Sequence, residues 1–385
     1  MNKKKILILC YSDLKSDPRV QRQIEALQPD FNIEVCAKGD SGINDIPFYQ
    51  IYETPPSSIT RKLTRLFQFI FRMYDNYYWD DYKKSLVANL SPKKYDVIIA
   101  NDIKTLPLAL GIADNYSKVY FDSHDYHPDE FNDDLKWKIF VRPFIRFLCR
   151  KYIPKAAAFS TSSQSIAEGY HKYLNILPHV ITNATRYYDM EPVATKEDNI
   201  KLIHHGAAIE GRKIEVMIET MKHLDNKYSL YLMLTGKGGE YYYQLKKAAA
   251  GYTNIFFLDP VPFNDIISTI NRYDIGFYCL ASSNFNNRNL LPNKIFEFVQ
   301  ARLCVVVSPT HEMAKLVNDY KLGVVSSGFT PKDMAGAIES LTAEKIMQYK
   351  QNSHLAAKIL TSESNMKKIH SIVSGLAAEN NKQVH

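Results

Sequence analysis

The chain has 385 residues, of which 45 % are hydrophobic and 23 % charged, and its formal net charge is +7. Single hydrophobic cores rarely grow beyond roughly 250–300 residues, so this length argues against one domain and favours two. The composition is ordinary for a soluble globular protein, and the charge is too modest to identify an anionic partner by itself.

The N-terminal segment "MNKKKILILC" has the basic start of a signal peptide, but its apolar run covers only Ile6–Cys10 and no small-residue cleavage site follows. We expect a first strand there. No apolar run approaches the roughly 20 residues that a membrane-spanning helix needs. Four of the five cysteines lie in or beside apolar runs, which indicates buried thiols in a reducing compartment. We therefore expect a cytoplasmic protein, with a location at the inner face of a membrane as the alternative.

Short apolar, β-branched runs alternate with helix-length amphipathic segments along nearly the whole chain. The runs are Ile6–Cys10, Ile33–Ala37, Val97–Ala100, Val119–Asp122, Phe159–Ser162, Leu202–His205, Leu230–Leu234, Ile255–Leu258, Ile275–Cys279 and Val305–Ser308. Runs that are apolar on both faces predict buried parallel strands joined by crossover helices. These strands are too many for one comfortable sheet, and the polar segment Arg186–Asn199 offers a break. We expect an α/β fold of two Rossmann-like, doubly wound parallel-sheet domains that face a central cleft.

Two segments of the first half combine basic and aromatic residues at helical spacing. They are "ITRKLTRLFQFIFRMYDNYYWDDY" (59–82) and "LKWKIFVRPFIRFLCRKYI" (135–153). Such segments suit an interfacial helix on anionic lipid, so peripheral membrane contact is one interpretation. The other is the core face of an ordinary helix. No nucleic-acid-binding module is recognisable, and we expect no nucleic-acid partner.

The loop "FDSHDYHPDE" (121–130) follows a predicted strand and brings together His124, Asp125, His127 and Glu130. Ligands at neighbouring positions of one loop, without a second cluster, make a poor closed metal site. The chain also has no Asp-x-Asp motif that would hold a metal ion against a diphosphate. We therefore expect no metal. A polar loop that caps the next helix is the structural alternative.

The first strand of the second half ends at Gly206, and Arg212 and Lys213 enter the next helix. Two cations beside helix amides favour an anion site, although a solvated basic turn has the same pattern. Further along, "LTGKGGEYYYQL" contains Gly236-x-Gly238, the start of a dinucleotide fingerprint, with Tyr241 at the third glycine position. A tight turn explains these glycines equally well.

The segment "LLPNKIFEFVQARLCVVVS" (290–308) contains a short helix pattern with Glu297 inside it, followed by an apolar strand. Pro292 and Asn293 suit a helix start, and Ile295, Phe298 and Val299 form an apolar stripe. A glutamate one turn into such a helix can accept hydrogen bonds from a vicinal diol while the helix amides face phosphates. An exposed glutamate with good helix propensity is the alternative.

These segments together resemble family 4 glycosyltransferases of the GT-B fold. The resemblance is carried by "HHGAAIEGRKIEVMIETM", "LYLMLTGKGGEYYYQL", "NIFFLDPVPFNDI", "RYDIGFYCL" and "NNRNLLPNKIFEFVQARLCVVVS", which occur in the family's order and spacing. "SDPRVQRQIEAL" and "FDSHDYHPDE" are similar to one branch of the family. The resemblance implies an N-terminal acceptor-side domain over residues 1–186 and a C-terminal donor domain over 199–360. Residues 361–385 would form a helix that crosses back to the first domain.

The resemblance also implies roles for single residues. Glu297 matches the glutamate that binds the ribose hydroxyls, and the family's other glutamate falls on Asn289, which keeps hydrogen bonding but loses the charge. Of the family's two phosphate cations one matches Arg212, whereas the other falls on Ala207. The implied donor-binding set is Gly206, Arg212, Lys213, Gly236, Val261, Leu290, Leu291, Asn293, Lys294 and Glu297. His124 and Asn289 would be the catalytic pair, with Arg19 and Asp125 on the acceptor side; a structural salt bridge is the equal alternative for Arg19.

These assignments predict a metal-independent, retaining hexosyltransferase of polysaccharide biosynthesis. It would need no cofactor and would move a sugar from a nucleoside diphosphate to a glycan or lipid-linked acceptor. The departures at Asn289 and Ala207 keep two alternatives open, namely a non-catalytic sugar-nucleotide-binding partner and a GT-B-shaped sugar-nucleotide epimerase. A dinucleotide-dependent oxidoreductase is a third alternative, and it rests only on "GKGGE".

Overall fold

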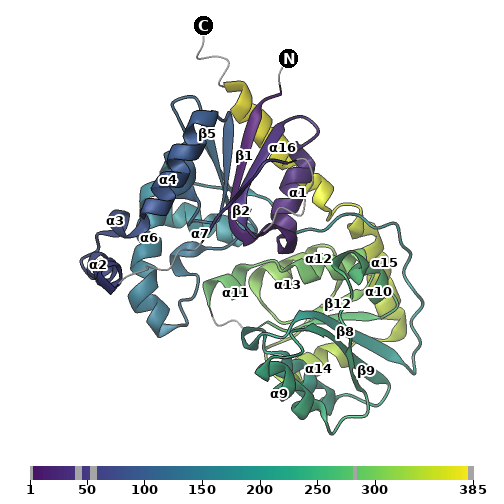
Figure 1. Ribbon diagram of the computed structural model, residues 1–385. Coiled ribbons are helices and arrows are strands. Elements are labelled where there is room, and N and C mark those ends of the chain that lie inside the picture. The colour runs from purple at the N-terminus through teal and green to yellow at the C-terminus, as the bar shows by residue number, and fades with distance from the viewer. Residues whose placement is uncertain (1–2, 40–45, 53–58, 281–283, 380–385) are drawn as a thin grey trace. The chain divides into compact units, whose positions relative to one another are not determined.

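The computed structural model describes residues 3–39, 46–52, 59–280 and 284–379 (Figure 1). The chain divides into two compact units. The first comprises Met1–Ile181, Asn284–Asn286 and Asn365–His385, and the second comprises Thr182–Ser283 and Asn287–Ser364. Each unit is an α/β structure with its own sheet.

The described part of the first unit contains a seven-stranded sheet in which every pairing is parallel. Its order is β3 (Phe48–Gln50), β2 (Asn32–Lys38), β1 (Lys5–Asp13), β4 (Val97–Asn101), β5 (Lys118–Ser123), β6 (Ala158–Thr161) and β7 (His179–Val180). The helices are α1 (Pro18–Leu27), α2 (Ile59–Ile70), α3 (Tyr74–Tyr78), α4 (Asp81–Leu90), α5 (Leu106–Ile112), α6 (Arg142–Tyr152), α7 (Gln164–Leu174) and most of α16 (Ser362–Glu379).

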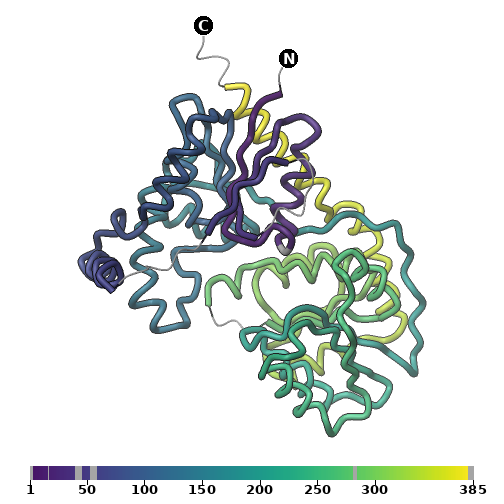
Figure 2. The backbone as a smooth tube through the Cα atoms, viewed as in Figure 1, coloured from purple at the N-terminus to yellow at the C-terminus, as the bar shows by residue number. Residues whose placement is uncertain are grey.

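The alternation of side chains along β1 builds a three-layer unit. Leu7 and Leu9 face a core shared with α4, α5, α6 and α7. Ile6 and Ile8 face the opposite core, which α1 and α16 cover. Figure 2 shows this closure, with the yellow C-terminal segment lying along the purple N-terminal one. A buried strand that is apolar on both faces is what a parallel sheet requires.

The second unit repeats the same strand order. Its described residues form six parallel strands: β10 (Ile255–Leu258), β9 (Tyr228–Thr235), β8 (Ile200–Ala207), β11 (Ile275–Tyr278), β12 (Cys304–Val307) and β13 (Gly323–Val325). Its helices are α8 (Ile214–Thr220), α9 (Glu240–Ala249), α10 (Ile266–Ile270), α11 (Phe285–Asn289), which begins in the first unit, α12 (Asn293–Gln300), α13 (His311–Asp319), α14 (Pro331–Glu339) and α15 (Ala343–Ala357). In both units the order reverses beside the first strand, and open parallel sheets bind ligands at such a point.

The expected two-domain, doubly wound architecture is confirmed, and each of the ten apolar runs lies in or overlaps a strand. The short strands β3, β7 and β13 were not predicted, because two or three residues at a sheet edge carry little periodicity. The segment expected as a linker, Arg186–Asn199, is part of the second unit. The buried Arg302 side chain holds it by donating hydrogen bonds to Tyr188 O at 2.5 Å and Met190 O at 3.1 Å.

Candidate functional site

Gly206, at the end of β8, lies directly beneath two cations of the second unit. A Cβ built on this glycine would lie 2.7 Å from Lys294 Nζ and 3.2 Å from Arg212 Nη1, and its φ of +121° also favours glycine. Burial, followed by the charge of Arg212, lowers the pKa of Lys294 to about 8. The two positive charges repel each other, and the glycine leaves open space beside them. An anion with several negative charges would bind both cations and relieve this repulsion.

Helix α12 carries both Lys294 and Glu297 and is held close to the sheet at Gly276. A Cβ there would lie 2.3 Å from the Phe298 ring, so only glycine allows this approach. Glu297 is buried, and its Oε2 lies 3.2 Å from Nε2 of His205 on β8. This placement contradicts the alternative of an exposed glutamate. A buried carboxylate one turn from a buried cation can accept hydrogen bonds from hydroxyl groups next to an anion.

His205 was not predicted as a site residue, although it immediately precedes Gly206. Its neighbour His204 stacks on Tyr278 with the ring centroids 5.7 Å apart, and burial lowers the pKa of His204 well below its ordinary value. Lys294 Nζ lies 5.7 Å from the centroid of the same Tyr278 ring. The neighbours of Lys294 on this side are therefore the Tyr278 ring and, stacked on it, the His204 imidazole.

The other predicted donor-side residues have mixed placements. Lys213 is exposed, has a left-handed φ of +50° and pairs with Glu215 at 3.7 Å. Gly236 forms a turn with a φ of +87°, and Val261 and Leu290 pack partly buried against the core of the second unit. Leu291 is buried with Ala184 and Phe296 and has a packing role.

Asn289 and Asn293 frame the start of α12. Asn289 is half-buried at the end of α11, and Asn293 is the first residue of α12. Pro292, which we expected at the helix start, occupies the N-cap position. The amides near the start of α12 thus follow a short connection from Asn289.

The loop "GKGGE" has a structural explanation that weakens the dinucleotide hypothesis. Tyr241, at the third glycine position, accepts a hydrogen bond from Ile214 N at 2.9 Å and donates one to Glu215. A bulky side chain engaged in these contacts replaces the close helix–strand approach that the fingerprint's third glycine provides.

The first unit contains a pocket of about 1350 Å³ at the carboxyl ends of β1, β2 and β4. Its lining includes five cations, the three carboxylates Asp17, Asp80 and Asp102, and many aromatic side chains. The cations are Lys38, Lys62, Arg65, Lys83 and Lys104, and the aromatic residues are Tyr11, Tyr52, Phe69, Tyr77, Tyr78, Tyr82, Phe140 and Phe144. Such a lining suits a partly apolar ligand that bears negative charge or sugar rings.

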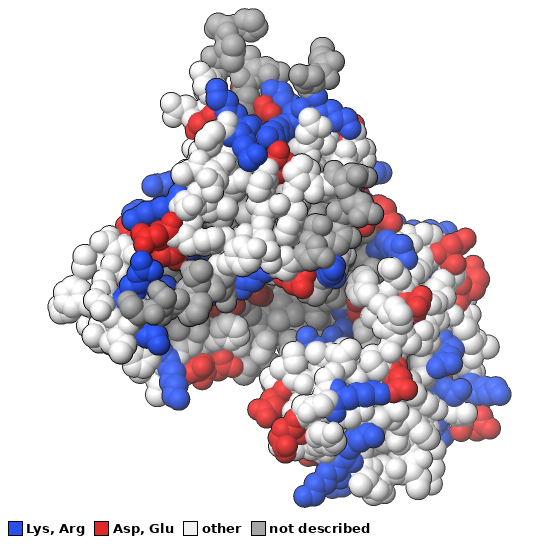
Figure 3. Space-filling view, viewed as in Figure 1, with Lys and Arg blue, Asp and Glu red and all other residues white. Residues whose placement is uncertain are grey.

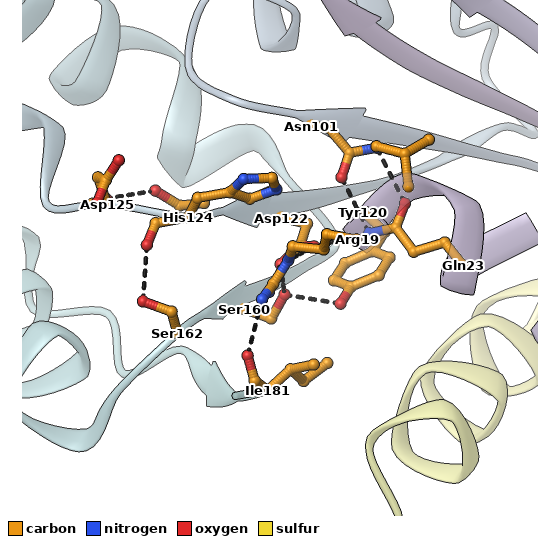
Figure 4. Close-up of polar contacts among 12 residues, drawn as sticks. Arg19, Gln23, Asn101, Tyr120, Asp122, His124, Asp125, Ser160, Ser162 and Ile181 are labelled. Carbon is orange, nitrogen blue, oxygen red and sulfur yellow. Dashed lines mark hydrogen bonds and ion pairs between the residues drawn. The ribbon is translucent and has the colours of Figure 1, made fainter. Parts of the chain in front are cut away.

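His124 is among the residues that line this pocket, and Figure 4 shows its side chain. Its backbone is held by a 2.7 Å hydrogen bond from Ser162 Oγ to His124 O, while its Nε2 is buried and has no hydrogen-bond partner among the described residues. Burial, followed by the charge of Arg19, lowers the pKa of His124. His124 thus brings a neutral imidazole to the pocket, with an unused nitrogen that is buried in the free protein.

Asp125, which the resemblance places on the acceptor side, follows His124 directly in the same loop. Its carboxyl and the His124 imidazole point in opposite directions in Figure 4. The backbone carbonyl of Asp125 instead accepts hydrogen bonds from Ser123 Oγ at 2.8 Å and Tyr170 OH at 2.9 Å. Burial, followed by the charge of Glu130, raises the pKa of the Asp125 carboxyl to about 6.

Arg19 forms a buried ion pair, so the structural alternative is the one that its contacts favour. Its Nε and Nη2 donate to the two Asp122 carboxylate oxygens at 2.8 and 2.6 Å, and its Nη1 donates to Ile181 O at 3.0 Å (Figure 4). Gln23 and Ser160 donate to the same carboxylate. Although burial opposes ionisation, Arg19 holds the pKa of Asp122 below its ordinary value. This guanidinium ties α1 to β5.

Asp102, which lines the pocket, was not predicted. It follows β4 in a left-handed conformation with a φ of +79°, unusual for a residue other than glycine and frequent at functional sites. His127 connects it to Glu130, with Nε2 3.4 Å from Asp102 and Nδ1 2.9 Å from Glu130. These carboxylates raise the pKa of His127 to about 9 against the effect of burial. Among the described residues no three His, Cys, Asp or Glu side chains are grouped to hold a metal ion.

Residues 199–344 match the model of a family described as Glycosyl transferases group 1. No curated protein sequence matches the chain. Among solved structures, sucrose-phosphate synthase from Thermosynechococcus elongatus is similar over 98 % of this chain and 100 % of its own, with 11 % identity and a TM-score of 0.73. Anabaena HepE in complex with UDP-glucose matches 96 % of this chain and 99 % of its own, with 16 % identity and a TM-score of 0.70. WaaG, a glycosyltransferase involved in lipopolysaccharide biosynthesis, matches 96 % and 100 %, with 12 % identity and a TM-score of 0.67. The chain therefore has the GT-B fold.

Proposed function

We propose that this protein is a glycosyltransferase that moves a sugar from a nucleoside-diphosphate donor to a glycan or lipid-linked acceptor. The observation that carries the proposal is the edge of the second unit where Lys294 and Arg212 flank Gly206 while Glu297 is buried in the same helix as Lys294. A diphosphate next to a ribose needs two cations and a nearby carboxylate. This edge lies within the residues that match the glycosyltransferase family model.

The chemistry assigned to this edge is stabilisation of the leaving group. As the bond from the sugar to the diphosphate breaks, negative charge grows on the phosphate oxygens, and preorganised cations stabilise it most where water is excluded. Lys294 compensates for Ala207, which stands where the family 4 pattern has a cation. In this proposal the cations replace a metal ion, and the family 4 resemblance supports retention of configuration.

The pocket of the first unit is the proposed acceptor site. His124, with its unused Nε2, would bind and orient a hydroxyl group, and the pocket's cations would receive an anionic part of the acceptor. Asn289 keeps its proposed role beside the donor sugar, as a hydrogen-bonding replacement for the family's glutamate. We place the reaction in polysaccharide biosynthesis in the cytoplasm. HepE was crystallised with UDP-glucose, so UDP-sugars are the first donors to test.

The donor site is tested by thermal unfolding of the purified protein with UDP, GDP, ADP and NAD. At about 100 times the dissociation constant, a nucleoside diphosphate should stabilise the folded protein by roughly 2.7 kcal/mol. In Glu297→Ala we expect about ten- to a hundredfold weaker binding, because a charge-assisted hydrogen bond contributes roughly 1.5–3 kcal/mol. Glu344→Ala, which removes an exposed carboxylate of the same unit, should bind like the wild type.

Other outcomes would redirect the assignment. Binding of NAD alone would favour the oxidoreductase, and unchanged affinity in Glu297→Ala would remove the ribose assignment. For turnover, NMR of the products distinguishes transfer from epimerisation, because an epimerase releases a changed donor without any acceptor. Nucleotide binding without turnover across a broad acceptor panel would favour a non-catalytic partner, which Asn289 in place of the glutamate would explain.

A further inference from the structure

Helix α2 is unusual because none of its residues, all of which are described, is buried. Ile59, Leu63, Leu66, Phe67 and Ile70, here called the apolar stripe, recur at helical spacing and are 53–76 % exposed. A surface helix ordinarily turns such a stripe toward the core. Here the stripe faces outward, and this orientation needs an explanation.

The contacts of α2 come from a different side of the helix. The Arg65 guanidinium lies 4.9 Å from the centroid of the Tyr77 ring, and the Phe69 ring packs edge-on against Tyr74 and Tyr77 at 5.8 and 5.2 Å. These residues attach α2 to α3. The attachment therefore fixes the orientation of the helix and presents the apolar stripe away from the core.

A second exposed apolar segment precedes α6, in and beside the π-helix Trp137–Val141. Leu135, Ile139 and Phe140 are 69, 56 and 59 % exposed. Phe140 and Leu66 line the same pocket, so the two segments are neighbours around its rim. Together they form a larger apolar area than the single exposed side chains that are normal on a protein surface.

Cations lie within and beside this area, and carboxylates border it: Asp81 lies 3.7 Å from Arg61, and the exposed Asp133 and Asp134 precede Leu135. Helix α2 contains Arg61, Lys62 and Arg65 and no carboxylate, and the exposed Lys136 and Lys138 flank the second segment. We define the docking surface as the apolar stripe with Leu135, Ile139, Phe140, Lys62, Lys136 and Lys138. Figure 3 shows Lys and Arg side chains beside uncharged surface around α2 in the first unit.

We propose that the docking surface binds an anionic lipid bilayer, with α2 lying in the plane of the headgroups. Apolar side chains that enter the acyl boundary, and cations that pair with acidic headgroups, are the combination that interfacial helices use. Trp137, next to Lys136 and Lys138 in the sequence, packs partly buried against the core of the first unit and lies 5.9 Å from the Phe131 ring, so it reports on the region directly beneath the docking surface. None of the described helices is both long and apolar enough to span a bilayer, so contact would be confined to one leaflet.

The docking surface and the pocket share Lys62, Leu66 and Phe140. A lipid surface bound there would therefore lie at the rim of the pocket. If the proposed glycosyltransferase function holds, the acceptor is lipid-linked and enters from the bilayer. The docking itself requires no turnover, so it can fail or succeed independently of the enzymatic proposal.

The test is flotation of the purified full chain with vesicles of phosphatidylglycerol and phosphatidylcholine in equal parts, and with phosphatidylcholine alone. We expect binding to the mixed vesicles only, and weaker binding as salt rises. Changing Lys62, Lys136 and Lys138 to Gln should weaken it about fivefold for each cation, or roughly a hundredfold together. Leu63→Ser/Phe67→Ser/Ile70→Ser should also release the protein.

Matched controls replace the same residue types elsewhere. Leu177→Ser/Leu355→Ser/Ile359→Ser removes three apolar side chains that are 60–64 % exposed, and Lys332→Gln/Lys345→Gln/Lys358→Gln removes three exposed cations. Both control proteins should bind vesicles like the wild type. If the controls lost as much vesicle binding as the docking-surface variants, the proposal would be wrong, because binding would then depend on the overall charge and hydrophobicity of the protein rather than on these residues.

The depth to which the docking surface enters the bilayer provides the second readout. The chain has two tryptophans, so Trp79→Phe leaves Trp137 as the reporter. Its fluorescence should be quenched by vesicles that contain brominated acyl chains. Absence of both flotation and quenching would overturn the proposal. So would a concentration-dependent dimer that the apolar triple variant abolishes in the absence of vesicle binding, because the stripe would then serve a second copy of the chain.

Discussion

Lys294 shows how the surroundings of one side chain set its chemistry. It is buried beside Arg212, and both effects disfavour its charged form, lowering its pKa to about 8. A bound diphosphate would reverse the second effect, because negative charge nearby favours the protonated amine. The amine should therefore be half protonated near pH 8 in the free protein and protonated to higher pH in the complex.

This linkage predicts a pH dependence of nucleotide binding. Since the complex has the higher pKa, affinity should be greatest below pH 8 and fall about tenfold between pH 7 and pH 9. Lys294→Arg should remove that dependence, because a guanidinium stays charged over this range. Calorimetric titration of the wild type and of Lys294→Arg at the two pH values measures this dependence. Protonation of the nucleotide itself would change the affinity of both proteins equally, so the difference between them reports on Lys294. A wild-type affinity that does not change with pH would contradict the role of Lys294.

Arg19 allows a second test at the scale of single residues. Arg19→Met leaves the buried Asp122 carboxylate without its cation, which should lower the free energy of unfolding by roughly 3–5 kcal/mol. Arg19→Met/Asp122→Asn should recover a large part of this loss. Urea denaturation measures both variants. If Arg19 instead served an acceptor, the single variant would lose activity while its stability stayed near that of the wild type.

The position of a single residue was predictable from the sequence where its neighbours lie at the ends of adjacent strands and helices. Gly206, Arg212 and Lys294 converge because a strand end, a short loop and a helix start meet at one edge of a parallel sheet. The pairing of Glu297 with His205 was not predictable, since it depends on how deeply α12 packs over Gly276. Asp102 was missed because its left-handed backbone leaves no mark in the pattern of residue types.

Among the elements, α16 is the clearest example of long-range closure. Ile369, Val373, Leu376 and Ala377 recur at helical spacing and pack against the core that contains Ile6 and Ile8. The core between β1 and the helices α1 and α16 therefore includes residues from both ends of the sequence.

Val373→Ala should destabilise the first unit by roughly 2 kcal/mol, from the lost burial and the cavity that remains. Hydrogen exchange followed by peptide should show faster exchange in β1 and β2 than in the wild type, with β8 and β9 unaffected. Ser371→Ala, at an exposed position of the same helix, is the matched control. Equal acceleration in both units would show that α16 does not belong to the first core alone.

Helix α2 shows the limit of prediction at the scale of elements. Its periodicity predicted an amphipathic helix, but the same stripe suits a protein core and a lipid surface equally. Whether the stripe is buried or exposed depends on which side of the helix α3 covers. That side is set by the packing of Phe69 and Arg65 rather than by the spacing of the stripe.

For the whole molecule, the two-domain parallel architecture followed from the alternation of apolar runs with helical segments, because buried parallel strands are apolar on both faces. The place where the chain passes from one unit to the other did not follow. The irregular segment after Ile181 has no periodicity, and it belongs to the second unit through contacts with Arg302 and Gln300 that lie far along the sequence.

The membership of residues 365–379 in the first unit has a consequence for biosynthesis. A ribosome makes the whole second unit before it makes the helix that completes the first. Until then the sheet face that α16 covers exposes part of its apolar surface, while the second unit already has all its strands. Domains generally fold as they emerge. The nascent chain should therefore finish its second unit first and carry an uncovered, aggregation-prone sheet face until α16 is synthesised.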